Sequence, residues 1–209
     1  MGGINIKLVE ALPDGMWAVR WNVEYAVDEQ GNPISVDRYE EEVYPHIPTI
    51  EDVQRTITEC YNKQTEAVIR FGFVWNGRSV YLSDENRFNF KAIIDECARV
   101  EAAIAIWDNE NPDFAGLNLT YIDGSNENGD AAKIAIPTGR PTSLLPVTLK
   151  LGKTNLPESF YVFNTLAELQ EFFNAGVHHL INAYGAGWMK ISAFDYTPYV
   201  TALENLNKG

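Results

Sequence analysis

The amino-acid sequence predicts an α+β fold, with antiparallel sheet elements, about three packed helices and an inserted β-hairpin. Three observations lead to this class. Hydrophobic residues alternate at every second position near the N-terminus, which is typical of strands. They recur at helical spacing in three later stretches, each opened by a capping residue. Between the second and third of these stretches the composition shifts to Asn, Asp, Gly and Pro, which indicates an insertion.

The first 45 residues are predicted to form an N-terminal β segment. Residues 4–10 and 16–27 alternate in hydrophobicity, and in the second run Trp17, Val19 and Trp21 share one face while Arg20 belongs to the other. Turn-forming residues occupy positions 28–33, and a further strand is expected within 34–48. The segment should therefore contain three strands.

A capped helix, a hairpin and a second helix are predicted next. Thr49 and Asp52 form a capping box for a helix that ends near residues 70–72. Asn76–Gly77 is the strongest short hairpin signal in the chain, and Ser83 then caps the second helix. We expect Trp75 and Val80 of the hairpin to be mostly buried neighbours. The buried stripe of the second helix should comprise Phe90, Ile93, Ile94, Cys97, Val100 and Ile104.

Residues 100–143 are predicted to be an insertion. Two short apolar runs, 117–122 and 132–136, flank the polar sequence at 123–130, which predicts a β-hairpin with a long mobile tip. The tip has acidic and amide oxygens, but it lacks the alternating ligands and the terminal Glu of a calcium loop. We therefore expect a loop without a bound metal.

The last third should contain strands within 144–152 and 158–163 and a helix opened by Thr165 and Glu168. Gly185 and Gly187 are predicted to end this helix. Residues 200–209 are expected to form a frayed C-terminal tail. Aromatic residues gather after the glycines, and Trp and Tyr often anchor protein contacts, so this segment is either core filling or an interface. The candidate interface residues are Trp188, Phe194, Tyr196 and Tyr199.

Charge and composition exclude several classes of partner. The 209 residues carry a formal net charge of −13, with no basic stripe, which disfavours nucleic acids and anionic membrane surfaces. No stretch approaches the ~20 apolar residues of a membrane span, so synthesis and folding in a cytoplasm are expected. Cys60 and Cys97 are predicted to be reduced and buried.

The sequence offers no recognisable catalytic, metal or cofactor site. His178 and His179 are adjacent, and adjacent helical positions point ~100° apart, so they cannot share a metal as an i,i+4 pair can. No nucleophile motif or phosphate-binding glycine loop occurs. Carboxylates are abundant, but no sequence motif identifies any two of them as a general acid and a general base. We therefore expect no catalytic residues, no metal and no cofactor.

Two stretches contain distinctive motifs. The first is "HIPTIEDVQRTITECYNKQTEAVIRFGFVWNGRSVYLSDENRFNFKAIIDE", residues 46–96, with an F-x-W-x-G hairpin followed by V-x-L-S-x-E-N-x-x-N-F-K-A. The second is residues 145–199, with "LPVTLKLG", "TLAEL" and a closing "GW" segment. Both stretches resemble an uncharacterised family of phages and prophages, found especially in Bacteroides-type gut bacteria. The resemblance implies that residues 46–199 form a family-like domain with an insertion at about 100–143, and the N-terminal 45 residues lie outside it.

The resemblance implies a setting near tail or tail-fibre genes and supplies no catalytic residues. The expected function is therefore a non-enzymatic phage structural protein of the tail or tail-fibre region, acting through protein–protein contacts. Its expected partners are phage tail or tail-fibre proteins, in a homo-oligomer or a larger assembly. The expected location is the virion, after synthesis in the bacterial host cytoplasm. Two alternatives stay open: a tail-fibre assembly chaperone, and a host-directed glycan-active hydrolase using two carboxylates.

Overall fold

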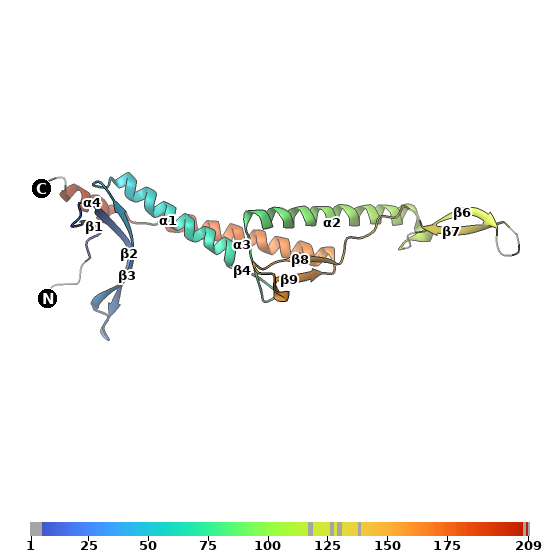
Figure 1. Cartoon of the computed structure of the whole chain (residues 1–209), viewed down its shortest axis with the longest axis horizontal. Helices are drawn as coiled ribbons and strands as arrows, with labels where there is room; N and C mark the ends of the chain where they lie inside the picture. The colour runs from blue at the N-terminus through green and yellow to red at the C-terminus, as the bar shows by residue number, and fades with distance from the viewer. Residues whose placement is uncertain are drawn as a thin grey trace. The chain divides into compact units, whose positions relative to one another are not determined.

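The computed structural model describes residues 6–116, 119–125, 128, 131–137, 139–206 and 208 (Figure 1). The predicted α+β class is confirmed, because antiparallel sheets and four α-helices occur among these residues. The strands are β1 Val9–Ala11, β2 Trp17–Val27, β3 Pro33–Tyr44, β4 Phe73–Trp75, β5 Arg78–Val80, β6 Leu119–Ser125, β7 Ala131–Pro137, β8 Val147–Lys150 and β9 Phe160–Phe163. The α-helices are α1 Ile50–Phe71, α2 Asp84–Glu110, α3 Leu166–Ser192 and α4 Thr197–Leu206.

The chain forms two compact units. Unit 1 contains residues 1–66 and 184–209, and unit 2 contains residues 67–183, so helices α1 and α3 each contribute to both. The predicted segments 1–45, 46–199 and 200–209 divide the chain differently. The reason is that the first strands share their core with residues near the C-terminus, which sequence proximity does not reveal.

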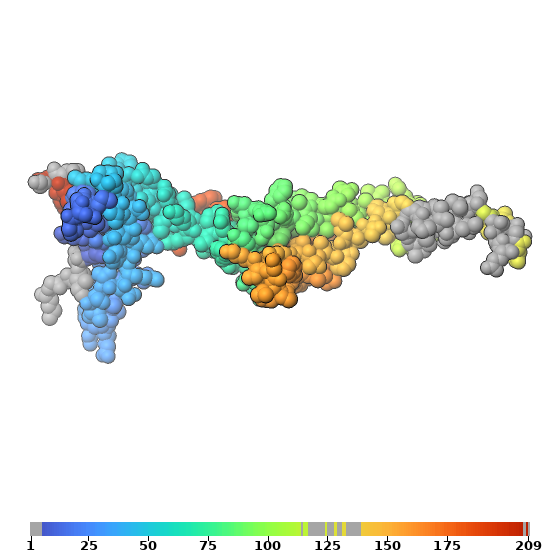
Figure 2. Space-filling model, in the orientation of Figure 1, coloured from blue at the N-terminus to red at the C-terminus, as the bar shows by residue number. Residues whose placement is uncertain are grey.

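Unit 1 is built on an antiparallel sheet in the order β1-β2-β3. The register pairs Val9 with Val19 and Trp17 with Tyr44. Helices α1 and α4 supply the other side of the core, and Figure 2 shows the blue N-terminal and red C-terminal segments together in this unit. Its buried residues are Val9, Val19, Trp21, Tyr44, Val53, Ile57, Tyr61, Tyr199 and Leu203.

Strand β2 departs from the simple alternation that the sequence predicts. Strict alternation places Arg20 on the polar face, yet Arg20 is only 8% exposed. Its guanidinium donates to Glu10 at 2.7 Å and to Glu41 at 2.6 Å, which offsets the cost of burying the charge. Beyond it, Asn22 takes a left-handed conformation with φ 49°, and the register to β3 shifts there. The strand therefore carries a bulge that re-aims its side chains.

Unit 2 packs the β4–β5 hairpin and the β8–β9 pair against α2 and α3. The backbone N–H of Tyr81 donates to the carbonyl of Leu151 at 2.7 Å, which ties the end of β5 to the segment after β8. The core is rich in aromatic rings, and Phe172 lies 5.1–6.0 Å from four of them. The buried residues are Phe73, Val80, Leu82, Phe90, Ile94, Cys97, Leu149, Leu151, Phe163, Leu169 and Phe172.

The local signals around the hairpin are confirmed in most respects. Asn76 and Gly77 have φ values of 45° and 76°, as a tight hairpin turn requires. Val80 is 1% exposed, but its cross-strand partner is Phe73, and Trp75 instead faces Arg78. Trp75 is mostly buried, as predicted: its indole Nε1 is buried, and its ring lies 5.6 Å from that of Phe172. Phe73, opposite Val80, is 6% exposed and belongs to the core of unit 2.

Helix caps match their sequence signals. The Thr49 N–H donates to the Asp52 carboxylate at 3.0 Å, and the Asp52 N–H donates back to the Thr49 hydroxyl at 3.2 Å. Ser83 accepts from the Asn86 N–H at the start of α2. Five of the six residues predicted for the stripe of α2 are buried, with Ile93 partly so. Both helix starts are therefore stabilised by hydrogen bonds between residues three positions apart in the sequence.

The inserted β-hairpin is confirmed as the antiparallel pair β6–β7, with Leu119 opposite Pro137 and Ser125 opposite Ala131. Helix α2 continues through Glu110, so residues 100–110 of the predicted insertion belong to this helix. Asp123 to Ser125, assigned to the loop, belong to β6. Half of the predicted mobile tip at 123–130, including Asp130, lies outside the described residues.

The end of α3 corrects two predictions. Gly185 and Gly187 do not end the helix, which continues to Ser192. A side chain at Gly187 would overlap the Thr65 hydroxyl of α1, so this glycine permits close helix packing within unit 1. Residues 200–206 of the segment expected to fray belong to α4, and Leu203 of this helix is buried in the core of unit 1.

Candidate interaction surfaces

Trp188 is the one predicted interface residue that lies open to solvent. It sits in the part of α3 that belongs to unit 1, and its side chain is 67% exposed. The ring of Tyr184 stacks on it, with centroids 6.0 Å apart and planes inclined by 22°. The Tyr184 hydroxyl donates to Glu66 at 3.3 Å. The indole is therefore supported on one side by a residue that is itself held in place.

The other three predicted residues belong to the core of unit 1. Tyr199 is 3% exposed, and its hydroxyl donates to the Arg20 carbonyl at 2.8 Å. Burial raises the pKa of its phenol. Phe194 and Tyr196 are partly buried, with ring centroids 4.8 Å apart, and Phe194 packs on Tyr61. This placement favours the core-filling alternative for Phe194, Tyr196 and Tyr199.

Other exposed apolar residues were missed from the sequence. Met189 beside Trp188 is 71% exposed, and Phe88 on α2 of unit 2 is 74% exposed. One sequence signal points to part of this surface: α3 has no Asp, Glu, Lys or Arg from Asn174 through Met189, in a chain where 22% of residues are charged. A helix surface without charges is typical of a buried face. Searching for uncharged helical runs would have found Met189.

Unit 2 has an apolar groove between α2 and α3. It is about 160 Å³ in volume and is walled by the aromatic side chains of Phe73, Phe90, Phe172 and Phe173. Val177 also lines it and is 39% exposed. Two cationic residues of α2, Arg87 and Lys91, complete the lining. Such a groove can accept a hydrophobic side chain of a partner.

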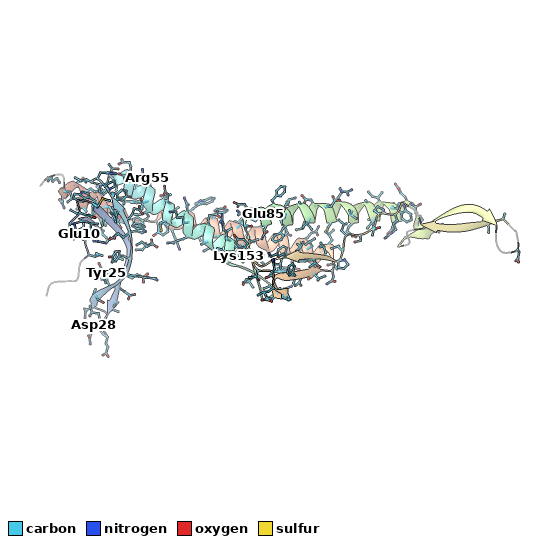
Figure 3. All side chains as sticks on the ribbon, viewed as in Figure 1. Glu10, Tyr25, Asp28, Arg55, Glu85 and Lys153 are labelled. Carbon is cyan, nitrogen blue, oxygen red and sulfur yellow. The ribbon has the colours of Figure 1, made fainter. Side chains whose placement is uncertain are left out.

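A second groove of unit 2 has two cationic side chains in its lining, Arg78 and Lys153. Lys153, labelled in Figure 3, lies 5.8 Å from the ring centroids of both Phe71 and Tyr81. Arg78 lines the same groove and donates to the carbonyls of Glu158 and Phe160. The two cations are held by rings and backbone oxygens, so this surface is organised by contacts within the unit.

The β2 bulge of unit 1 borders a polar hollow. Glu40 accepts from Asn22 at 3.1 Å, from Gln64 at 2.9 Å and from the Cys60 thiol at 3.1 Å. Glu24 lines the same hollow, and its hydrogen bond from Arg38 lowers its pKa. Glu24 is therefore held ionised, whereas the acid of a glycosidase needs a raised pKa. The hollow can accept a polar group, and Glu24 is unsuited to donate a proton in it.

The cysteines have the environments expected of unreactive thiols. Both are free, Cys97 is buried and Cys60 is partly buried. Burial raises the pKa of each thiol, and the neighbouring Glu40 raises that of Cys60 further. A raised pKa keeps the thiol protonated at neutral pH and makes it a poor nucleophile.

The histidines do not converge. His179 contacts the Val68 carbonyl through Nε2 at 3.0 Å and stacks near Phe73, whereas His178 is exposed. His46 lies 3.4 Å from Asp52 at the start of α1. Within the described ranges, no three His, Cys, Asp or Glu residues come together in a way that would hold a metal ion. In the same ranges, no helix is long and apolar enough to cross a bilayer.

Comparison with known proteins gives no match: no family model, no curated protein and no solved structure is similar to this chain.

Proposed function

We propose that this chain is a non-enzymatic structural protein of a phage tail or tail-fibre region that acts through protein–protein contacts. The observation that carries the proposal is the set of large apolar side chains that stand in solvent on its helices. Phe88, Trp188 and Met189 are each about two-thirds exposed or more. Fully burying such a side chain contributes roughly 1.5–3 kcal/mol. Adjacent exposed side chains of this size, as at Trp188 and Met189, favour a surface that a partner covers, whereas Phe88 stands singly.

The phage setting rests on the resemblance of residues 46–96 and 145–199, and the net charge of −13 agrees with protein partners better than with nucleic acid. In this proposal the protein is made in the bacterial cytoplasm and enters the particle by docking on tail components. It then works as one copy among several in an assembly.

Quantitative mass spectrometry of gradient-purified particles tests the proposal. The protein should be present at a fixed ratio to a known tail protein through successive gradients, while an abundant host cytoplasmic protein is depleted. Recovery in complexes from infected cells, together with absence from particles, would replace the structural role by that of an assembly chaperone. Absence from both would overturn the proposal.

A further inference from the structure

The groove lined by Arg78 and Lys153 holds two positive charges that no carboxylate of the described residues neutralises. Most Lys and Arg side chains among these residues lie within 4.0 Å of a carboxylate. Arg78 and Lys153 make no such ion pair, and Glu158, which also lines the groove, contacts Arg78 through its backbone carbonyl. In a chain of net charge −13, two such cations in one groove favour an anionic ligand.

Contacts within unit 2 hold Arg78 and leave one edge of its guanidinium free. Nη1 donates to the carbonyl of Glu158 at 2.7 Å and to that of Phe160 at 3.1 Å, and the guanidinium carbon lies 5.7 Å from the centroid of the Tyr161 ring. Nη1 has used both of its N–H groups in these bonds, whereas Nε and Nη2 keep theirs. The Nε–Nη2 edge is suited to a carboxylate, which accepts two parallel hydrogen bonds from it.

Lys153 is held by aromatic rings and by the backbone of its loop. Its Nζ lies 5.8 Å from the ring centroids of both Phe71 and Tyr81, and aromatic rings attract an ammonium group without cancelling its charge. The Leu151 N–H donates to the Ser159 carbonyl at 2.7 Å, and the Leu151 carbonyl accepts from the Tyr81 N–H at 2.7 Å. Because the loop and the side chain already have partners, little freedom is lost when an anion binds.

The remaining groups of the groove favour an acidic protein segment over an acidic sugar or a phosphate. The hydroxyls of Thr154 and Ser159 lie 2.7 Å apart and bond to each other, and Ser159 is only 5% exposed, so this pair is not available to the ring hydroxyls of a sugar. The net charge of −13 disfavours polyphosphates such as nucleic acid. Phe71 lines the groove and is 57% exposed, which gives an apolar side chain of a peptide a surface to cover.

We propose that the groove of Arg78 and Lys153 binds a short acidic segment of a partner protein, with one carboxylate on the Nε–Nη2 edge of Arg78 and another at Lys153. The inference rests on the proposed function and names the chemistry of the partner. The groove has a volume of about 410 Å³, within the range of about 300–1,000 Å³ that is usual for ligand sites. It therefore accepts a few side chains of an extended segment.

Fluorescence anisotropy tests the contact with the full chain. The probe is a fluorescein-labelled peptide of alternating Glu and Leu, and a peptide of alternating Gln and Leu is its matched control. At an ionic strength of about 10 mM, where exposed charges are weakly screened, the acidic peptide should bind and the control should not. Its dissociation constant should be below about 1 mM and should rise as salt is added.

Charge variants locate the site. Lys153→Gln, at an exposed position, should weaken binding about 3–5-fold, and Lys153→Arg should change it less than about 2-fold. Arg78→Lys keeps the charge but loses the two-bond edge, so it should also weaken binding about 3–5-fold. Lys190→Gln removes the same charge from an exposed position of unit 1 and should change binding less than about 2-fold. Circular dichroism of each variant checks folding, and Lys153→Gln alone decides if Arg78→Lys is misfolded.

Competition separates the possible anions. Sodium glucuronate and sodium phosphate should displace the peptide no more than sodium chloride of equal ionic strength. Stronger displacement by either salt would overturn the proposal and assign the groove to an acidic sugar or to phosphate. Absence of peptide binding, equal binding of the Gln control, or an equal loss in Lys153→Gln and Lys190→Gln would also overturn it. Presence of the protein in purified particles would then leave the proposed function standing, because that measurement does not depend on this groove.

Discussion

Replacing Gly187 or Gly185 by Ala should have opposite effects on the stability of unit 1. In both cases Ala removes the backbone freedom of a glycine within α3, which stabilises a helix interior by about 0.5–1 kcal/mol. At Gly185 the new methyl group meets nothing within 4 Å, so the whole gain should appear. At Gly187 it would overlap Thr65 Oγ1 and lie 3.2 Å from Thr65 Cβ and Cγ2.

Thr65 cannot simply turn aside, because its hydroxyl donates to the Tyr61 carbonyl at 2.8 Å. Overpacking of this kind costs about 1–3 kcal/mol, so Gly187→Ala should lose a net of about 1–2 kcal/mol after the helix gain. Adding Thr65→Ala removes the overlapping atoms. The double variant should therefore recover about 1 kcal/mol relative to the sum of the two single changes.

Urea unfolding followed by circular dichroism measures these differences, and hydrogen exchange of peptides from α3 assigns them to unit 1. The chain has two compact units, so the two probes are needed together. Two results would contradict this reasoning: Gly185→Ala and Gly187→Ala shift stability in the same direction, or adding Thr65→Ala to Gly187→Ala recovers no stability. Close packing of α1 and α3 within unit 1 would then not be the reason for a glycine at position 187.

Further predictions concern the core and the helix cap. Phe172→Ala should destabilise unit 2 by about 3–5 kcal/mol, because Phe172 is 2% exposed. Phe88→Ala, at a 74% exposed position, should change the free energy of unfolding by less than about 0.5 kcal/mol. Urea unfolding compares the two variants, and equal losses of stability would contradict the assigned core. Hydrogen bonds from Thr49 and Arg55 hold the pKa of Asp52 below its ordinary 3.8, so its contribution is complete above about pH 4 and is lost as pH falls. Asp52→Asn should therefore flatten the acid side of the stability profile, measured by thermal melts from pH 2 to 7, and an unchanged slope would argue against this cap. Cys60 and Cys97 should react slowly with a thiol reagent at pH 7 and quickly in denaturant, since burial raises the pKa of both, and rapid labelling of the native protein would contradict that environment.

Short-range chemistry explains what could be predicted from the sequence. The Asn76–Gly77 turn needs positive φ at both positions, and the Thr49 and Ser83 caps need only side chains within three residues. These features are independent of the rest of the chain. The same holds for the helical stripe of α2, which was predicted almost completely.

Long-range packing explains what could not be predicted. Gly187 looks like a helix end until Thr65, far away in the chain, is placed beside it. Arg20 looks like a surface residue until Glu10 and Glu41 lie on either side. From the sequence Tyr199 looks available for a partner, but in the structure its hydroxyl donates a hydrogen bond to the carbonyl of Arg20. The exposed groove of unit 2 is also a product of tertiary packing, since its walls come from separate elements.

Unit 1 contains residues 1–66 and 184–209, and this determines the order in which the two units can fold during synthesis. The Arg20 carbonyl leaves the ribosome long before the Tyr199 hydroxyl that bonds to it, with all of unit 2 synthesised in between. At about 5–20 residues per second this delay is on the order of 10 s. During that time the strands β1–β3 and the first part of α1 lack α4 and the end of α3, so their apolar face is uncovered. Unit 2 can fold in one stretch as it emerges, and unit 1 is completed only after residues 184–209 have emerged as well.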